Sequence, residues 1–276
     1  MKHREGEREG VGGLKLYTQS WLPDGRARAT VVLAHGAGEH STRYHDVGET
    51  LAEAGYAVRT LDHRGHGRSE GERMLVSDVD EFVDDLRSLI AAAREGKRKG
   101  KVFLLGHSMG GLISLAYACD YQREIDGLLL SAPVAALAAA DPVTRRVSKV
   151  LGAVAPRLGV YKVDSEQISR DPAVVLDYDT DPLVYHGRYP ARTIASLTRT
   201  VESFPERVQG LELPLLAMHG SADKIAPPQG SEMVIERAAS ADKTLRIYHG
   251  LRHEILFEPE GDRVLADAIG WLDERA

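Results

Sequence analysis

The sequence is poor in cysteine, in long apolar runs and in excess positive charge. Its single cysteine, Cys119, excludes an intrachain disulfide and a cysteine-rich zinc site. No run approaches the ~18 consecutive apolar residues of a membrane-spanning helix, and the N-terminal segment lacks the apolar stretch of a secretory signal. Acidic residues outnumber basic ones by 41 to 35, and the net charge of −6 argues against a nucleic-acid partner. We therefore expect a soluble cytoplasmic protein.

Segments with the composition of β-strands alternate along most of the chain with segments of helical periodicity. Residues 31–34 and 102–105 are continuous apolar runs, which is typical of parallel strands buried on both faces. A capping-box pattern at residues 77–80 predicts the start of a helix, and two more helices are predicted at 109–121 and 259–274. The predicted strands are residues 14–22, 29–34, 57–61, 102–105, 127–130, 213–219 and 244–248.

This alternation predicts an α/β protein with a mostly parallel, doubly wound sheet covered by helices on both faces. The sheet domain is assigned to residues 1–132 and 213–276, with residues 1–12 as a frayed end. Between 133 and 212 the alternation breaks, prolines are frequent and an apolar stripe at helical spacing runs through 143–158. Because a structureless loop of that length is uncommon, we expect an inserted helical cap above the site.

The strongest chemical signal is a G-x-S-x-G motif, because residues 106–110 read Gly-His-Ser-Met-Gly. The motif follows a predicted strand and opens a predicted helix, which is the context of a nucleophile elbow. Glycines are needed on both sides because the sharp turn crowds the backbone around Ser108. We therefore predict that Ser108 is a catalytic nucleophile; the alternative is a small serine in an ordinary turn.

A serine nucleophile needs a base, and the base needs an orienting carboxylate. Asp223 follows the predicted strand 213–219, and His253 lies in the loop after the last predicted strand, so the chain order Ser, Asp, His fits this fold. His249 is a weaker candidate because the strand fixes its direction. Asp242 is weaker because it precedes its strand and should lie at the opposite rim of the sheet.

Residues 35–40 read His-Gly-Ala-Gly-Glu-His and follow the predicted strand 29–34. A glycine-flanked turn there can aim the N–H of Ala37 at the same point as the N–H of Met109. Together they would form an oxyanion hole; the alternative is a strand exit that needs glycine for a positive φ. The five-residue spacing of His35, His40 and His45 does not match a metal site, so no metal is predicted.

These motifs together resemble the α/β-hydrolase superfamily, and more narrowly the monoacylglycerol lipase and lysophospholipase family. The similarity covers residues 14 to 271 and is carried by His-Gly-Ala-Gly-Glu-His-Ser at 35–41, Arg-Tyr at 43–44, Gly-His-Gly-Arg-Ser-Glu-Gly-Glu-Arg at 65–73, the strand and elbow at 102–111, Asp-Pro-Leu at 181–183 and Lys-Thr-Leu-Arg-Ile-Tyr at 243–248.

The resemblance implies the same triad and oxyanion donors, an α/β-hydrolase fold, and no cofactor. It also implies that Glu39 and Arg43 contact a glycerol headgroup, for which the alternative is a salt-bridged turn. We expect hydrolysis of monoacylglycerols, with transient contact between the cap and a membrane surface. The rival functions are a general carboxylesterase or lysophospholipase on the same triad, and a non-catalytic ligand-binding relative.

Overall fold

The computed structural model describes residues 1–95, 100–137 and 150–276. Its main sheet has the strand order β1-β2-β4-β3-β5-β6-β9-β10, in which the pairs from β4 to β10 are parallel and the pairs β1–β2 and β2–β4 are antiparallel. The strands are β1 (Lys2–Glu9), β2 (Lys15–Leu22), β3 (Thr30–Ala34), β4 (Ala57–Leu61), β5 (Val102–His107), β6 (Gly127–Ser131), β9 (Leu215–Gly220) and β10 (Lys243–Tyr248).

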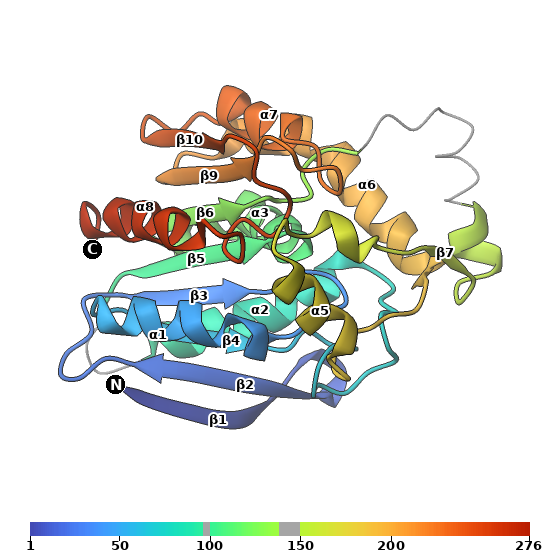
Figure 1. Ribbon diagram of the computed structural model, residues 1–276, viewed down its shortest axis with the longest axis horizontal. Helices are drawn as coiled ribbons and strands as arrows, with labels where there is room; N and C mark the ends of the chain where they lie inside the picture. The colour runs from blue at the N-terminus through green and yellow to red at the C-terminus, as the bar shows by residue number, and fades with distance from the viewer. Residues whose placement is uncertain (96–99, 138–149) are drawn as a thin grey trace.

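Helices cover both faces of this sheet, as predicted (Figure 1). One face packs against α1 (His45–Glu53) and α8 (Gly261–Asp273). The other face packs against α2 (Val79–Arg94), α3 (Met109–Tyr121), α6 (Ala191–Arg207) and α7 (Gln229–Arg237). This is the doubly wound α/β-hydrolase arrangement expected from the alternation of strands and helices.

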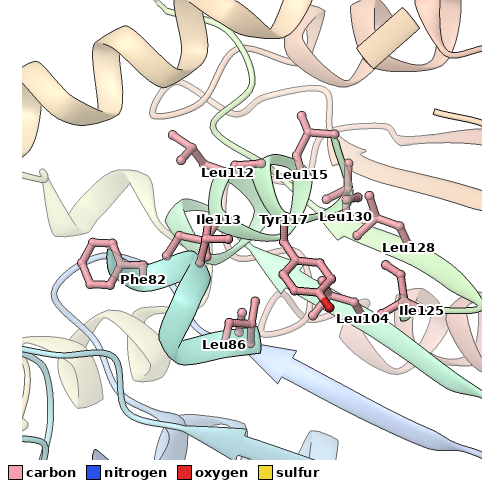
Figure 2. Packing of buried hydrophobic residues seen from close by; sticks show 14 of the residues in the cluster. Phe82, Leu86, Leu104, Leu112, Ile113, Leu115, Tyr117, Ile125, Leu128 and Leu130 are labelled. Carbon is pink, nitrogen blue, oxygen red and sulfur yellow. The ribbon is translucent and has the colours of Figure 1, made fainter. Parts of the chain in front are cut away.

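Alternation along the central strands divides the core into two layers. In β3, Val32 packs into the layer of α2 and α3, whereas Val31 packs into the layer of α1 and α8. Figure 2 shows part of the first layer, which contains Leu86 of α2, Tyr117 of α3 and Leu104 of β5. Both faces are apolar because both are buried, which is why these strands are continuous apolar runs.

The predicted start of α2 is confirmed with a shift of its cap by one residue. Asp78 is the N-cap: its side chain accepts a hydrogen bond from the backbone N–H of Asp80. The side chain of Glu81 in turn accepts from the N–H of Asp78 at 3.2 Å, which completes the capping box.

The prediction of a frayed N-terminus was wrong. Residues Lys2–Glu9 form β1, which pairs with β2 along its whole length, from Lys2 opposite Leu22 to Glu9 opposite Lys15. The strand was missed because it contains no apolar residue from Lys2 onward; backbone pairing at the sheet edge stabilises it without a buried face.

Between β6 and β9 the chain leaves the sheet and forms the predicted insertion. It contains α5 (Pro172–Thr180) and the short pair β7 (Gly159–Tyr161) and β8 (Tyr189–Pro190). Residues 138–149, which include part of the predicted apolar stripe, lie outside the described residues. In the described part of the chain, no helix is both long and apolar enough to cross a bilayer.

Helix α6 lies within the predicted cap range of 133–212 and packs on both parts of the molecule. Its residues Val201 and Phe204 are buried in the same apolar layer as α2 and α3, and the helix also contacts β7 and β8 of the insertion. The strong amphipathic pattern of this helix therefore reflects packing on the sheet domain.

Candidate active site

Ser108 stands in the strained turn between β5 and α3. Its backbone has φ 53° and ψ −117°, a conformation that residues with a side chain rarely adopt. The flanking glycines are sterically required: a Cβ at Gly106 would lie 2.4 Å from the carbonyl oxygen of Gly110, and one at Gly110 would lie 2.1 Å from that of Ala34. The turn thus has the geometry of a nucleophile elbow.

The structure brings Ser108, His253 and Asp223 together from three different strand ends. Nε2 of His253 lies 2.8 Å from Oγ of Ser108, and Nδ1 of the same ring lies 2.7 Å from Oδ2 of Asp223. Serine and histidine are 145 residues apart in the chain, so only the fold creates this contact. The arrangement allows the ring to take a proton from the serine while the carboxylate fixes its tautomer.

The charges around this ring favour proton acceptance. Burial alone lowers the pKa of His253, but the negative charge and the hydrogen bond of Asp223 outweigh it and raise the pKa above its ordinary value. Burial likewise works against ionisation of Asp223, yet the His253 charge and hydrogen bonds from His219 and His253 hold its pKa well below the usual range. Asp223 is therefore a carboxylate near neutral pH.

A second histidine, His219, also holds Asp223 and was missed from the sequence. Its Nε2 lies 3.0 Å from Oδ2 of Asp223 and 2.9 Å from the carbonyl oxygen of Ala226. Because a carbonyl only accepts, Nε2 carries the proton, and Nδ1 accepts from the hydroxyl of Ser231 at 2.8 Å. The available signal was a histidine at the end of a strand four residues before the predicted acid.

The loop after β3 lies against Ser108 and is held from both sides. A carboxylate oxygen of Glu39 accepts hydrogen bonds from the N–H of Gly36 at 2.5 Å and from the hydroxyl of Tyr44 at 2.6 Å. From the cap, the Tyr189 hydroxyl donates to the carbonyl oxygen of Ala37 at 3.0 Å. Met109 is the first residue of α3, so its N–H has no acceptor within the helix.

Glu39 and Arg43, the predicted headgroup contacts, belong to a buried ionic network. The guanidinium of Arg43 donates to Glu39 at 2.6 Å and forms a two-pronged pair with Glu254 at 2.7 and 2.8 Å. It also lies over the rings of Tyr178 and Phe257. The alternative of a salt-bridged turn is thus present in the structure, while Glu39 also lines the space in front of Ser108.

The cap closes over this site. The cavity in front of Ser108 has a volume of only about 30 Å³, and Val163, Ile168 and Tyr178 of the cap line it. A larger cavity of about 680 Å³ lies on the other side of Arg43, between α1, α5 and the start of α8. The ionic network of Arg43 therefore separates a small catalytic chamber from a wider cavity of mixed polar and apolar lining.

The rejected candidates lie elsewhere. His249 is exposed, and Asp242 pairs with Arg275 at the rim opposite Ser108. His40 contacts Asp181 of the cap, and His45 accepts a hydrogen bond from the Trp21 indole. In residues 1–95, 100–137 and 150–276, no three His, Cys, Asp or Glu side chains are placed to hold a metal ion.

Comparison with known proteins gives a consistent assignment. The family model described as serine aminopeptidase, S33, matches residues 25–260. The monoacylglycerol lipase of Mycolicibacterium smegmatis is 44% identical over 264 residues, which cover 95% of this chain and 94% of that protein.

Two solved structures have the same fold over nearly the whole chain. The monoacylglycerol lipase of Paleococcus ferrophilus superposes with a TM-score of 0.86 at 33% identity, covering 95% of this chain and 99% of that one. A soluble variant of monoglyceride lipase from Saccharomyces cerevisiae, in complex with a substrate analog, superposes at 0.90 with 27% identity, covering 100% and 96%. This chain therefore belongs to the serine aminopeptidase S33 family of α/β hydrolases, within the group that contains the monoacylglycerol lipases.

Proposed function

We propose that this protein is a serine ester hydrolase that cleaves monoacylglycerols to glycerol and free fatty acid. The observation that carries the proposal is the pair of hydrogen bonds that joins Ser108 to His253 and His253 to Asp223 beneath the cap. The related proteins named monoacylglycerol lipase supply the substrate class. No cofactor enters this reaction.

In the first half of the reaction, Oγ of Ser108 attacks the ester carbonyl carbon. Nε2 of His253 takes the hydroxyl proton, and Asp223 stabilises the imidazolium that forms. The carbonyl oxygen becomes negatively charged and accepts hydrogen bonds from the N–H groups of Ala37 and Met109. When the tetrahedral intermediate collapses, the C–O bond to glycerol breaks, and the departing oxygen takes the proton from His253.

In the second half, water hydrolyses the acyl group on Ser108. His253 removes a proton from the water as its oxygen attacks the acyl carbon, and the same two N–H groups bind the oxyanion. Collapse returns the proton from His253 to Oγ of Ser108 and releases the fatty acid. The strained backbone of Ser108 keeps Oγ at one place through both halves.

Glycerol recognition is assigned to Glu39 and Arg43. Glu39 lines the chamber of Ser108, and Arg43 lines the larger cavity behind it. A glycerol hydroxyl can donate to the carboxylate of Glu39 or accept from the guanidinium of Arg43 without breaking the pair between Arg43 and Glu254.

Substrate entry requires the cap to move, because binding sites for small molecules measure ~300–1,000 Å³ and the chamber in its present form is far smaller. The cap carries the exposed apolar side chains Val150, Val154, Leu158 and Tyr161. We assign to them a transient contact with a lipid surface, reached by a cytoplasmic enzyme from the aqueous side.

The membrane contact is tested with Val154→Asp, since Val154 is 73% exposed and its replacement removes no packing. Hydrolysis of monooleoylglycerol in vesicles is expected to fall severalfold, while hydrolysis of a soluble p-nitrophenyl ester stays unchanged. Equal rates of the variant and the wild type on vesicles would refute the contact.

The substrate is tested by fatty-acid release from 1-monooleoylglycerol, with lysophosphatidylcholine, trioleoylglycerol and a short p-nitrophenyl ester in parallel. Preference for the monoacylglycerol is expected, together with a lower preference in Glu39→Gln. Activity confined to the short ester would favour a general carboxylesterase, and a preference for lysophosphatidylcholine would favour a lysophospholipase. No turnover of any substrate, with no labelling of Ser108 by a fluorophosphonate, would favour a ligand-binding protein.

A further inference from the structure

Along the edge strand β1, basic and acidic residues occupy alternate positions. Basic residues occupy the even positions Lys2, Arg4 and Arg8, and acidic residues occupy the odd positions from Glu5 to Glu9. Because successive side chains of a strand point to opposite faces, β1 presents positive charge on one face of the sheet and negative charge on the other. The catalytic machinery makes no use of this pattern.

The strand register gathers arginines from two strands on the basic face. Arg4 lies opposite Ser20 of β2, and Ser20 lies opposite Arg59 of β4, so the three side chains occupy one row across the sheet. Gly6, the next even position, lies opposite Thr18 and contributes no side chain. A hollow of about 270 Å³ results, lined by Arg4, Arg8 and Arg59 together with Thr18, Ser20 and Leu89 of α2. Glu5 and Glu7 of β1 also line it, but they occupy odd positions, whose side chains point to the other face of the sheet.

The arginines at this hollow have few partners. In the part of the chain that the structure describes, no carboxylate forms an ion pair with Arg4, Arg8 or Arg59. Nε of Arg8 donates to the Ser88 hydroxyl at 2.9 Å, and Nε of Arg59 is buried without a hydrogen-bond partner. Burial and the neighbouring charge of Arg8 both lower the pKa of Arg59, as expected for like charges held together.

This arrangement destabilises the folded protein unless an anion binds to it, because a buried donor without a partner loses its hydration and gains no hydrogen bond in return. We propose that the hollow between β1, β2, β4 and α2 binds a phosphate group through the guanidinium groups of Arg4, Arg8 and Arg59. Guanidinium forks match the oxygens of phosphate, and the hydroxyls of Ser20 and Thr18 add neutral donors. A doubly charged phosphate balances three positive charges better than a single carboxylate does.

The test is calorimetric titration of the full chain with inorganic pyrophosphate at low ionic strength. The wild type is expected to bind, and Arg4→Gln and Arg59→Gln are each expected to weaken binding at least about tenfold. Arg4 is exposed, so its variant does not depend on repacking. The matched control is Arg246→Gln, which removes an exposed arginine from β10 at the other edge of the sheet and should bind like the wild type.

Equal affinity of Arg4→Gln, Arg59→Gln and Arg246→Gln for pyrophosphate, or no binding by the wild type, would overturn the site. Vesicles of phosphatidylcholine with phosphatidic acid identify the source of the phosphate. Retention on them that Arg4→Gln abolishes assigns a lipid headgroup, and pyrophosphate binding without retention assigns a soluble phosphate. Esterase activity on a soluble ester is expected to be unchanged in all three variants, so the two proposals fail independently.

Discussion

Arg43 forms a two-pronged ion pair with Glu254, the residue that follows the histidine paired with Ser108. The pair joins the loop after β3 to the loop after β10 across 211 positions of the chain. Because the same guanidinium also holds Glu39, one cation connects the loop next to Ser108 with the loop that carries His253. The two halves of the site therefore share a single buried support.

Removing that cation should destabilise the protein. Arg43→Met leaves the buried carboxylates of Glu39 and Glu254 without their cation, and losing one member of a buried ion pair costs about 3–5 kcal/mol. The free energy of unfolding in urea measures the loss. Arg87→Met is the matched control, because Arg87 pairs with Glu124 at the surface, where water screens the charges, and its loss should be much smaller. Equal losses in the two variants would contradict the role of Arg43.

The pH profile should report the state of His253. The ring must be neutral to accept the serine proton, and its pKa is raised, so kcat/KM should fall as the pH drops through a value above about 6.5. Asp223→Asn removes the negative charge that raises the pKa of His253, while burial still lowers it. The fall of kcat/KM in acid should therefore move to lower pH. Activity should also fall by ~10⁴. If kcat/KM of Asp223→Asn fell at the same pH as in the wild type, Asp223 would not set the pKa of His253.

Buried neutral histidines behind the site should make stability fall in acid. Burial lowers the pKa of His63 to about 3 and that of His66 to about 4, and His35 is lowered well below its ordinary value. Between about pH 6 and 4.5 the unfolded chain therefore binds more protons than the native one at these sites, and stability rises with pH. Each ring adds up to about 1.4 kcal/mol per pH unit to the slope of the unfolding free energy against pH.

His63→Phe isolates one of these contributions. Neither ring nitrogen of His63 has a hydrogen-bond partner, so a ring of similar shape removes the titration without breaking a bond. The slope of unfolding free energy against pH in this window should fall by about 1.4 kcal/mol per unit. Urea unfolding at several pH values measures it, and a slope equal to that of the wild type would show that His63 does not remain neutral.

The sequence could predict those parts of the fold that depend on local pattern. Helix α3 has the predicted bounds, because the elbow marks its start, and β4 matches the predicted strand at residues 57–61. Strand β1 was missed since nothing in its composition requires burial. The strand forms because β2 would otherwise have an unpaired edge. The residue pattern of a single segment does not show whether such an edge is available.

In the candidate site, too, the residues marked by local pattern could be predicted and the contacts set by packing could not. Ser108, Asp223 and His253 could be placed because each follows a strand whose carboxyl end faces the site. The bond from His219 to Asp223 and the pair between Arg43 and Glu254 depend on side-chain directions that only packing sets. The packing of α6 on the sheet domain could not be predicted for a similar reason, because an amphipathic helical pattern does not identify the element that covers its apolar face.

The catalytic role of Ser108 is tested most directly by oleate release from 1-monooleoylglycerol, measured for the wild type and for Ser108→Ala. The substitution removes only Oγ, whose partner is Nε2 of His253, so the variant should unfold at a similar urea concentration. In Ser108→Ala, kcat is expected to fall by up to ~10⁶. A folded Ser108→Ala variant that hydrolyses the substrate at close to the wild-type rate would contradict the catalytic role of Ser108.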